Sequence, residues 1–221
     1  MTRLTNLQTK HLLCLRSLPN IRSAWQDVKD KDAPDAWRCI VIEAVPTLLA
    51  DPTVSVTGLV SELQAIIRND SSLGVRSAAI VTSEAIILQG KSVAERSSIA
   101  DKGVSSIVAS VTAILHASGK ASTQLTSEES TMLSISFQSL LRLIRHANVD
   151  KSKYRGSIEA WGENYLRFDY NACLNYIRLL KSGIGMEPTS GLYDHAKRVA
   201  RSKSESRRID FIRNVNLDAD E

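Results

Sequence analysis

Two short turns between apolar segments constrain this chain more than any other feature. In the first turn Asp51 precedes Val56 by five residues, and in the second Asp70 precedes Val75 by five residues. Each Val opens a segment in which apolar residues recur every three or four positions, the period of an amphipathic helix. Helices joined by short turns pack side by side, so the stretch 46–90 predicts a helical array.

The remaining sequence has the same helical period and lacks the alternating residues and turn pairs of β-hairpins. We therefore predict an all-α fold, an array of antiparallel helices. Pro46 should kink the helix 34–50, and Gly103 either breaks the segment 92–118 into two helices or marks a close approach. The predicted helices are 5–17, a short one from 21, 34–50, 55–68, 75–89, 92–118, 127–146 opened by a capping box at Thr126 and Glu129, 157–170, 172–181 and 191–201, with 202–208 continuing the last helix or fraying.

The composition changes near residue 150. Residues 151–221 contain eight of the eleven aromatic residues and thirteen of the twenty-eight Lys and Arg residues. We predict a helical region over 1–150, followed by an aromatic- and basic-rich helical region over 151–221 with a mobile acidic end at 218–221.

A kinking proline, an Asp in each turn and a Val-Arg pair after the second turn occur between Trp37 and Gly90. The residues of this pattern are Pro46, Leu48, Leu49, Asp51, Val56, Leu63, Ile66, Ile67, Asp70, Val75, Arg76, Ala78 and Ala79. The pattern resembles the HEAT repeat, although Thr57 stands where that family has Arg. The resemblance implies a stacked array that binds macromolecules, with Arg76 partly buried beside Asp51 or Asp70.

The segment 75–89 is apolar nearly all round. Ile80 and Ile87 lie on the same side of the predicted helix as Arg76, Ser83 and Glu84. A helix with so many apolar faces is either buried on two sides or in contact with a partner. The candidate protein-binding residues are therefore Ile80, Ile87, Arg76 and Glu84.

The segment 197–213 contains seven Lys and Arg residues against Glu205 and Asp210, in a chain of net charge +4 and pI near 9.0. Clustered cations of this kind neutralise phosphates, and neighbouring aromatic rings stack on bases. The other interpretation is a solvated helix face. The candidate nucleic-acid-binding residues are Lys197, Arg198, Arg201, Lys203, Arg207 and Arg208, with Tyr193 as a stacking residue.

Catalytic and cofactor motifs are absent from the sequence. Cys14, Cys39 and Cys173 are far apart, the four His residues are scattered, and no serine sits in a Gly-x-Ser-x-Gly turn. We expect no enzyme activity, no metal or other cofactor and no small-molecule substrate. This cysteine usage favours a reducing compartment.

Residues 1–26 contain no acidic residue and carry Arg3, Lys10, Arg16 and Arg22. This composition resembles a mitochondrial targeting peptide, and it also fits an ordinary first helix. We find no apolar run near the roughly 18 residues of a membrane span. The expected localisation is intracellular, either cytoplasmic or nuclear, or else mitochondrial if the first residues are a targeting peptide.

Two functions agree with these features. The first is a non-catalytic helical scaffold or adaptor that binds a protein partner or associates with itself. The alternative is an RNA- or DNA-binding helical protein, such as a viral nucleocapsid or coat protein. The first depends on the HEAT-like turns and the two-sided helix 75–89, and the second on the basic, aromatic C-terminal third.

Overall fold

The structure is a computed structural model that describes residues 18–28, 33–51, 53–90, 93–119 and 124–215. The helix expected over 5–17, most of the candidate targeting segment and the acidic end 218–221 lie outside these residues. All regular elements in the described ranges are helical, which confirms the all-α prediction. They are α2 (Leu18–Val28), α3 (Asp35–Ala44), η1 (Val45–Ala50), α4 (Val56–Asn69), α5 (Leu73–Leu88), α6 (Val93–Gly119), α7 (Ser127–His146), α8 (Ser152–Ala160), η2 (Trp161–Arg167), α9 (Tyr170–Arg178), η3 (Leu179–Ile184), α10 (Ser190–Val199) and α11 (Lys203–Asn214).

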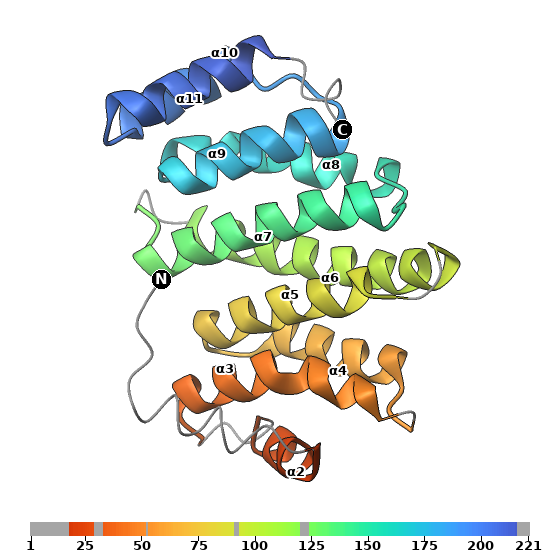
Figure 1. Cartoon of the computed structure of the whole chain (residues 1–221). Coiled ribbons are helices and arrows are strands. Elements are labelled where there is room, and N and C mark those ends of the chain that lie inside the picture. Colours follow the sequence, from red (N-terminus) through yellow and green to blue (C-terminus); the bar gives the residue numbers. More distant parts are fainter. Residues whose placement is uncertain (1–17, 29–32, 52, 91–92, 120–123, 216–221) are drawn as a thin grey trace.

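The helices are stacked from α2 at one end to α10 and α11 at the other (Figure 1). In one layer α3, α5, α7 and α9 contact each other in turn, while α4 contacts α6 and α6 contacts α8 in the other layer. One apolar core extends from Ile21 to Ile212. The core is therefore continuous across residue 150, where the sequence suggested a boundary between two regions.

The two turns that constrain the sequence are built by neighbouring side chains. The Asp51 carboxylate accepts the backbone N–H of Thr53 at 2.9 Å, and the Asp70 carboxylate accepts that of Ser72 at 3.0 Å. The helices that follow are capped by serines, because Ser55 accepts the N–H of Gly58 and Ser72 accepts that of Val75. The aspartates thus form the turns, and the serines supply the helix caps.

Pro46 changes the type of helix. The α-helical hydrogen bonding of α3 ends at Ala44, and the chain continues from Val45 as the 3-10 helix η1, with Pro46 in its first turn. Proline has no N–H to donate, so the i to i−4 bonding pattern is interrupted at this point. The predicted kink is therefore a switch to 3-10 geometry.

The segment 92–118 is one helix, α6, rather than two. A Cβ atom on Gly103 would lie 2.9 Å from Cδ1 of Ile87, so this glycine permits a close approach of α5. The part Arg96–Ala117 is long and apolar enough, by length and composition, to cross a membrane, and 61% of its most apolar window is buried in the fold. The expectation that no apolar run approaches that length was thus wrong, although the burial is typical of a core helix.

Helix boundaries after residue 150 differ from the predicted ones. Helix α8 begins five residues before the predicted position, after a turn in which Asp150 accepts the N–H of Ser152, and Asp169 caps α9 through the N–H of Ala172 at 2.8 Å. The helix continues past α9 as the π-helical η3, which ends at Gly185 with a φ of 73°. Ser202 begins a separate helix, α11, at a position where the sequence left continuation or fraying open.

Three of the aromatic residues after position 150 pack on Phe137 of α7. The ring of Phe137 lies 5.8 Å from that of Trp161, 5.7 Å from that of Phe168 and 5.1 Å from that of Tyr176. The capping box that starts α7 has both of its hydrogen bonds, because the Thr126 hydroxyl accepts the N–H of Glu129 and the Glu129 carboxylate accepts the N–H of Thr126. This aromatic cluster thus helps to join the C-terminal helices to α7, and α8 and η2 also contact α6.

Candidate functional site

The two isoleucines proposed for partner binding are core residues. Ile80 and Ile87 are 0% and 1% exposed, because α5 lies between α3 and α7 in its own layer and also packs on α4 and α6. Of the two interpretations of this helix, burial on both sides is correct. Ile80 and Ile87 cannot form the protein-binding surface for which they were proposed.

Glu84 is also an interior residue. Its carboxylate is 8% exposed and accepts a hydrogen bond of 3.0 Å from Arg142 Nη1 and another from the hydroxyl of Ser139. Both partners come from α7, so Glu84 joins two adjacent helices of one layer. Its role in the described fold is to hold α5 against α7, and it offers no free carboxylate to a partner.

Arg76 is partly buried as expected, but its bonding partners differ from the prediction. Its Nε donates to the carbonyl of Ile67 at 2.8 Å, and its Nη2 donates to the hydroxyl of Ser110 on α6. Burial lowers the pKa of Arg76, and the nearby charge of Asp70 opposes this shift. The predicted ion pair with Asp51 or Asp70 is made by other arginines, since Arg38 pairs with Asp70 and Arg22 with Asp51.

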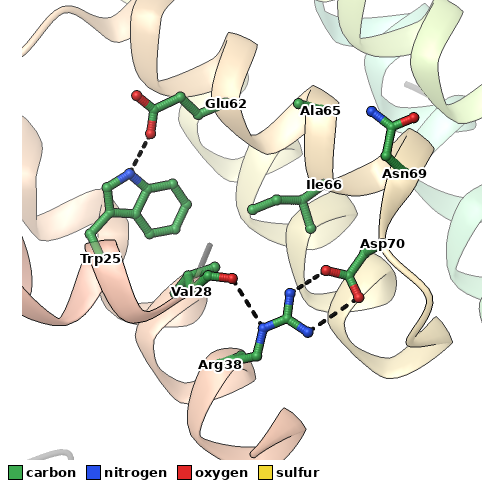
Figure 2. Close-up of a pocket in the computed structure, with 8 residues that line it drawn as sticks. All are labelled: Trp25, Val28, Arg38, Glu62, Ala65, Ile66, Asn69 and Asp70. Atoms are coloured by element: carbon green, nitrogen blue, oxygen red, sulfur yellow. Dashed lines mark hydrogen bonds and ion pairs between the residues drawn. The ribbon is translucent and has the colours of Figure 1, made fainter. Parts of the chain in front are cut away.

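The pair of Arg38 and Asp70 is buried beside a small pocket (Figure 2). The side chains are 3% and 6% exposed. Arg38 donates through Nε to the carbonyl of Val28 at 3.0 Å and through Nη1 and Nη2 to both Asp70 oxygens, the first at 3.3 Å. The hydrogen bonds that Arg38 donates to Asp70 raise the pKa of Arg38 more than burial lowers it.

The pocket measures about 270 Å³ and lies between α2, α3 and α4. Figure 2 shows the indole of Trp25 on one side, with its N–H donated to Glu62, and Ile66 projecting into the space. The arginine beside it already uses its donors on Asp70 and Val28. The arrangement ties α2 and α3 to the end of α4, and the described residues that line the pocket include no pair of groups suited to acid–base or nucleophilic chemistry.

Other reactive groups are also engaged or buried. In the ranges that the structure covers, no cluster of three or more His, Cys, Asp or Glu side chains is placed to hold a metal ion. Cys173 is buried, and burial raises the pKa of its thiol to about 12. A hollow of about 610 Å³ beside η2 is lined by Glu159, Glu163 and Glu187, but Glu187 already accepts from Tyr193 and pairs with Lys181.

The structure brings five of the six predicted cations to one end of the stack as exposed side chains. We call them the basic end surface. It comprises Arg198, Arg201, Lys203, Arg207 and Arg208, on the last turn of α10, the connection after it and the first turns of α11. Lys197, the sixth, pairs instead with Asp210 across the two helices.

Acidic residues also lie near the basic end surface. Glu205 accepts the backbone N–H of Arg201, Asp210 is the partner of Lys197, and the exposed Asp194 lies four residues before Arg198 on α10. Within the described chain, no ion pair joins the five cations to a carboxylate. Their charge is therefore available to an external anion.

Tyr193 does not serve as a stacking residue. It is 1% exposed, its hydroxyl donates to Glu187 at 2.9 Å, and the guanidinium of Arg213 lies 5.2 Å from its ring centre. Burial raises the pKa of Tyr193 above its ordinary value. The aromatic residue that the sequence reasoning missed is Phe211, which is 63% exposed. Phe211 follows Arg207 by four residues and Arg208 by three, so it lies on the same face of α11 as these arginines.

Arg178 of α9 adds a cation that the sequence reasoning also missed. It is half-buried, and its pKa is lowered mainly by burial and to a smaller extent by the positive charge of Arg208. The Tyr170 hydroxyl donates to the carbonyl of Glu205 at 3.3 Å and fixes the start of α11 over α9. The basic end surface therefore extends from α11 toward α9.

No family model, curated protein or solved structure matches the chain. The likeness of residues 37–90 to the HEAT repeat thus remains a resemblance. Function has to be inferred from the geometry of the described residues.

Proposed function

We propose that this protein binds single-stranded nucleic acid, and RNA in particular, through the basic end surface, without catalysing a reaction. The observation that carries the proposal is the exposure of Arg198, Arg201, Lys203, Arg207 and Arg208 on two consecutive helices and the connection between them. Cations placed in this way neutralise backbone phosphates and release their counterions, which supplies most of the affinity of sequence-independent binding.

The exposed Phe211 ring supports the same proposal. The ring of Phe211 is 63% exposed beside two arginines, a position from which it can stack on a base. A base stacked on an aromatic ring gains about 1–3 kcal/mol, whatever its identity. Cations beside an exposed ring are the combination used for single-stranded nucleic acid.

The protein-binding scaffold is the weaker candidate. It depended on the HEAT-like turns and on the two-sided helix 75–89, in which Ile80 and Ile87 were the proposed apolar contacts, and both of these are core residues. A terminal helix of a stack also needs a polar outer face for solubility, and α11 meets that need. That requirement explains polar residues in general, whereas it does not explain five exposed cations that form no ion pair with a carboxylate in the described chain.

The test is the salt dependence of RNA binding. A labelled single-stranded RNA is titrated with the full chain at several salt concentrations, and the log–log slope is expected near −0.7 for each phosphate contact. Replacing Arg201, Arg207 and Arg208 with Gln should make the slope about two units shallower. The matched control replaces Arg68, Lys151 and Arg155, which are exposed elsewhere, with Gln.

The control variant loses the same net charge, so it separates a local site from a general charge effect. If the chain does not bind RNA at low salt, the proposal is wrong, and the protein-binding scaffold becomes the preferred function. Equal loss in the two triple variants would show that total charge matters and that the basic end surface is not the site.

A further inference from the structure

Ser204 lies within the basic end surface and is exposed. It is the second residue of α11, after the capping Ser202, whose hydroxyl accepts the N–H of Glu205 at 3.1 Å. Arg207 and Arg208 follow it by three and four residues, so they lie beside Ser204 on the helix surface. A negative charge on this hydroxyl would meet both arginines.

The sequence before Ser204 has the form of a kinase substrate. Arg201 precedes it by three residues and Lys203 by one, both with exposed side chains. Protein kinases of the basophilic class select serines by such cations, through acidic groups of their own. We propose that Ser204 is a phosphorylation site and that its phosphate releases nucleic acid from the basic end surface; the second half rests on the proposed function.

The reaction is a phosphoryl transfer from a nucleoside triphosphate. The Ser204 oxygen forms a bond to the γ-phosphorus, and the bond from that phosphorus to the β-γ bridging oxygen breaks, which releases a nucleoside diphosphate. The hydroxyl proton passes to the catalytic carboxylate of the kinase. The product carries a charge of about −1.5 to −2 at neutral pH.

The position of Ser204 explains why the modification leaves the helix intact. Negative charge in the first turn of a helix is favoured by the helix dipole, and ion pairs to residues three and four positions later add to this effect. Ser202 is already used as the helix cap, and Ser206 is half-buried. Helix α11 is the last helix of the stack and has few neighbours besides α10, which leaves its first turn accessible.

The expected effect follows from the phosphate contacts that are lost. A phosphate on Ser204 that pairs with Arg207 and Arg208 removes their two contacts with RNA phosphates. Each such contact contributes about 0.7 to the slope of log affinity against log salt concentration. The slope then becomes about 1.4 units shallower, which corresponds to about 25-fold weaker RNA binding at 0.1 M salt.

The experiment treats the full chain with ATP and the catalytic domain of a kinase that requires Arg three residues before the serine. Mass spectrometry of peptides locates the phosphate, and Ser204→Ala identifies any transfer to other serines. RNA binding is then measured before and after treatment, alongside Ser204→Glu. The matched control is Ser127→Glu, at the exposed first turn of α7, where Glu128 and Glu129 follow.

The proposal expects phosphate on Ser204, helicity unchanged by circular dichroism, weaker and less salt-dependent RNA binding, and no such effect of Ser127→Glu. Phosphate found only on other serines, or an unchanged slope after modification of Ser204, would overturn it. If the untreated chain fails to bind RNA, the proposed function is wrong and the release step falls with it. The mass spectrum still decides whether Ser204 is a kinase site.

Discussion

Asp70→Asn should cost this protein a large part of its stability, because it removes the charge that neutralises a buried guanidinium. Arg38 is 3% exposed, and after the change it keeps the carbonyl of Val28 and a 3.5 Å ion pair with Asp35, whose side chain is 60% exposed and therefore screened by water. Removal of one partner from a buried pair costs about 3–5 kcal/mol. For a chain of this length, 1 kcal/mol shifts the melting temperature by about 2–4 °C, so we expect a drop of about 10 °C.

The assay is thermal and urea unfolding followed by circular dichroism. Asp210→Asn is the matched control, because it removes a carboxylate from the pair with Lys197, whose side chains are 33% and 49% exposed. An exposed pair contributes about 0–1 kcal/mol. The double variant Arg38→Met with Asp70→Asn should recover much of the loss, since it leaves no unpaired buried charge.

A loss below about 1 kcal/mol for Asp70→Asn would refute the assignment of a buried ion pair at this position. Failure of the double variant to recover stability would point instead to the turn at Ser72, whose N–H is bound by the same carboxylate at 3.0 Å. Both outcomes are obtained from the thermal and urea unfolding curves of the single and the double variant.

Three further predictions follow from burial. Ile80→Lys with Ile87→Lys should abolish folding, because each buried aliphatic side chain contributes about 1.5–3 kcal/mol, and a folded, helical double variant would show that these residues are not core. Gly103→Leu should lower the free energy of unfolding by about 1–3 kcal/mol, because the new side chain meets Ile87. Ile87→Ala should restore part of this loss. If the two substitutions change the free energy of unfolding additively, the contact is not the cause. Burial raises the pKa of Tyr176 and Tyr193 in the folded chain. The stability that these neutral side chains provide is therefore present below about pH 10 and is lost at higher pH, because the tyrosines of the unfolded chain ionise at lower pH than those of the folded chain. Tyrosinate absorbance that rises before helicity falls would contradict this prediction.

Local sequence patterns predicted the features that depend on residues a few positions apart. The capping box at Thr126, the interruption of helical bonding at Pro46 and the turns at Asp51 and Asp70 are present because each involves atoms within four residues of one another. The exposure of the arginines after residue 197 was also predictable, since such side chains are rarely buried without partners. These features determined the all-α class and the candidate nucleic-acid surface.

Tertiary structure decided which faces are buried and which charges meet. Helix α5 is buried on both sides only because α3 and α7 flank it, and its sequence alone fits a partner surface equally well. Arg38 rather than Arg76 reaches Asp70, and Tyr193 rather than Phe211 is buried, because these outcomes depend on helices distant in sequence. Helical periodicity reports that a face is apolar, but the neighbour that covers it is set by the packing of the whole stack.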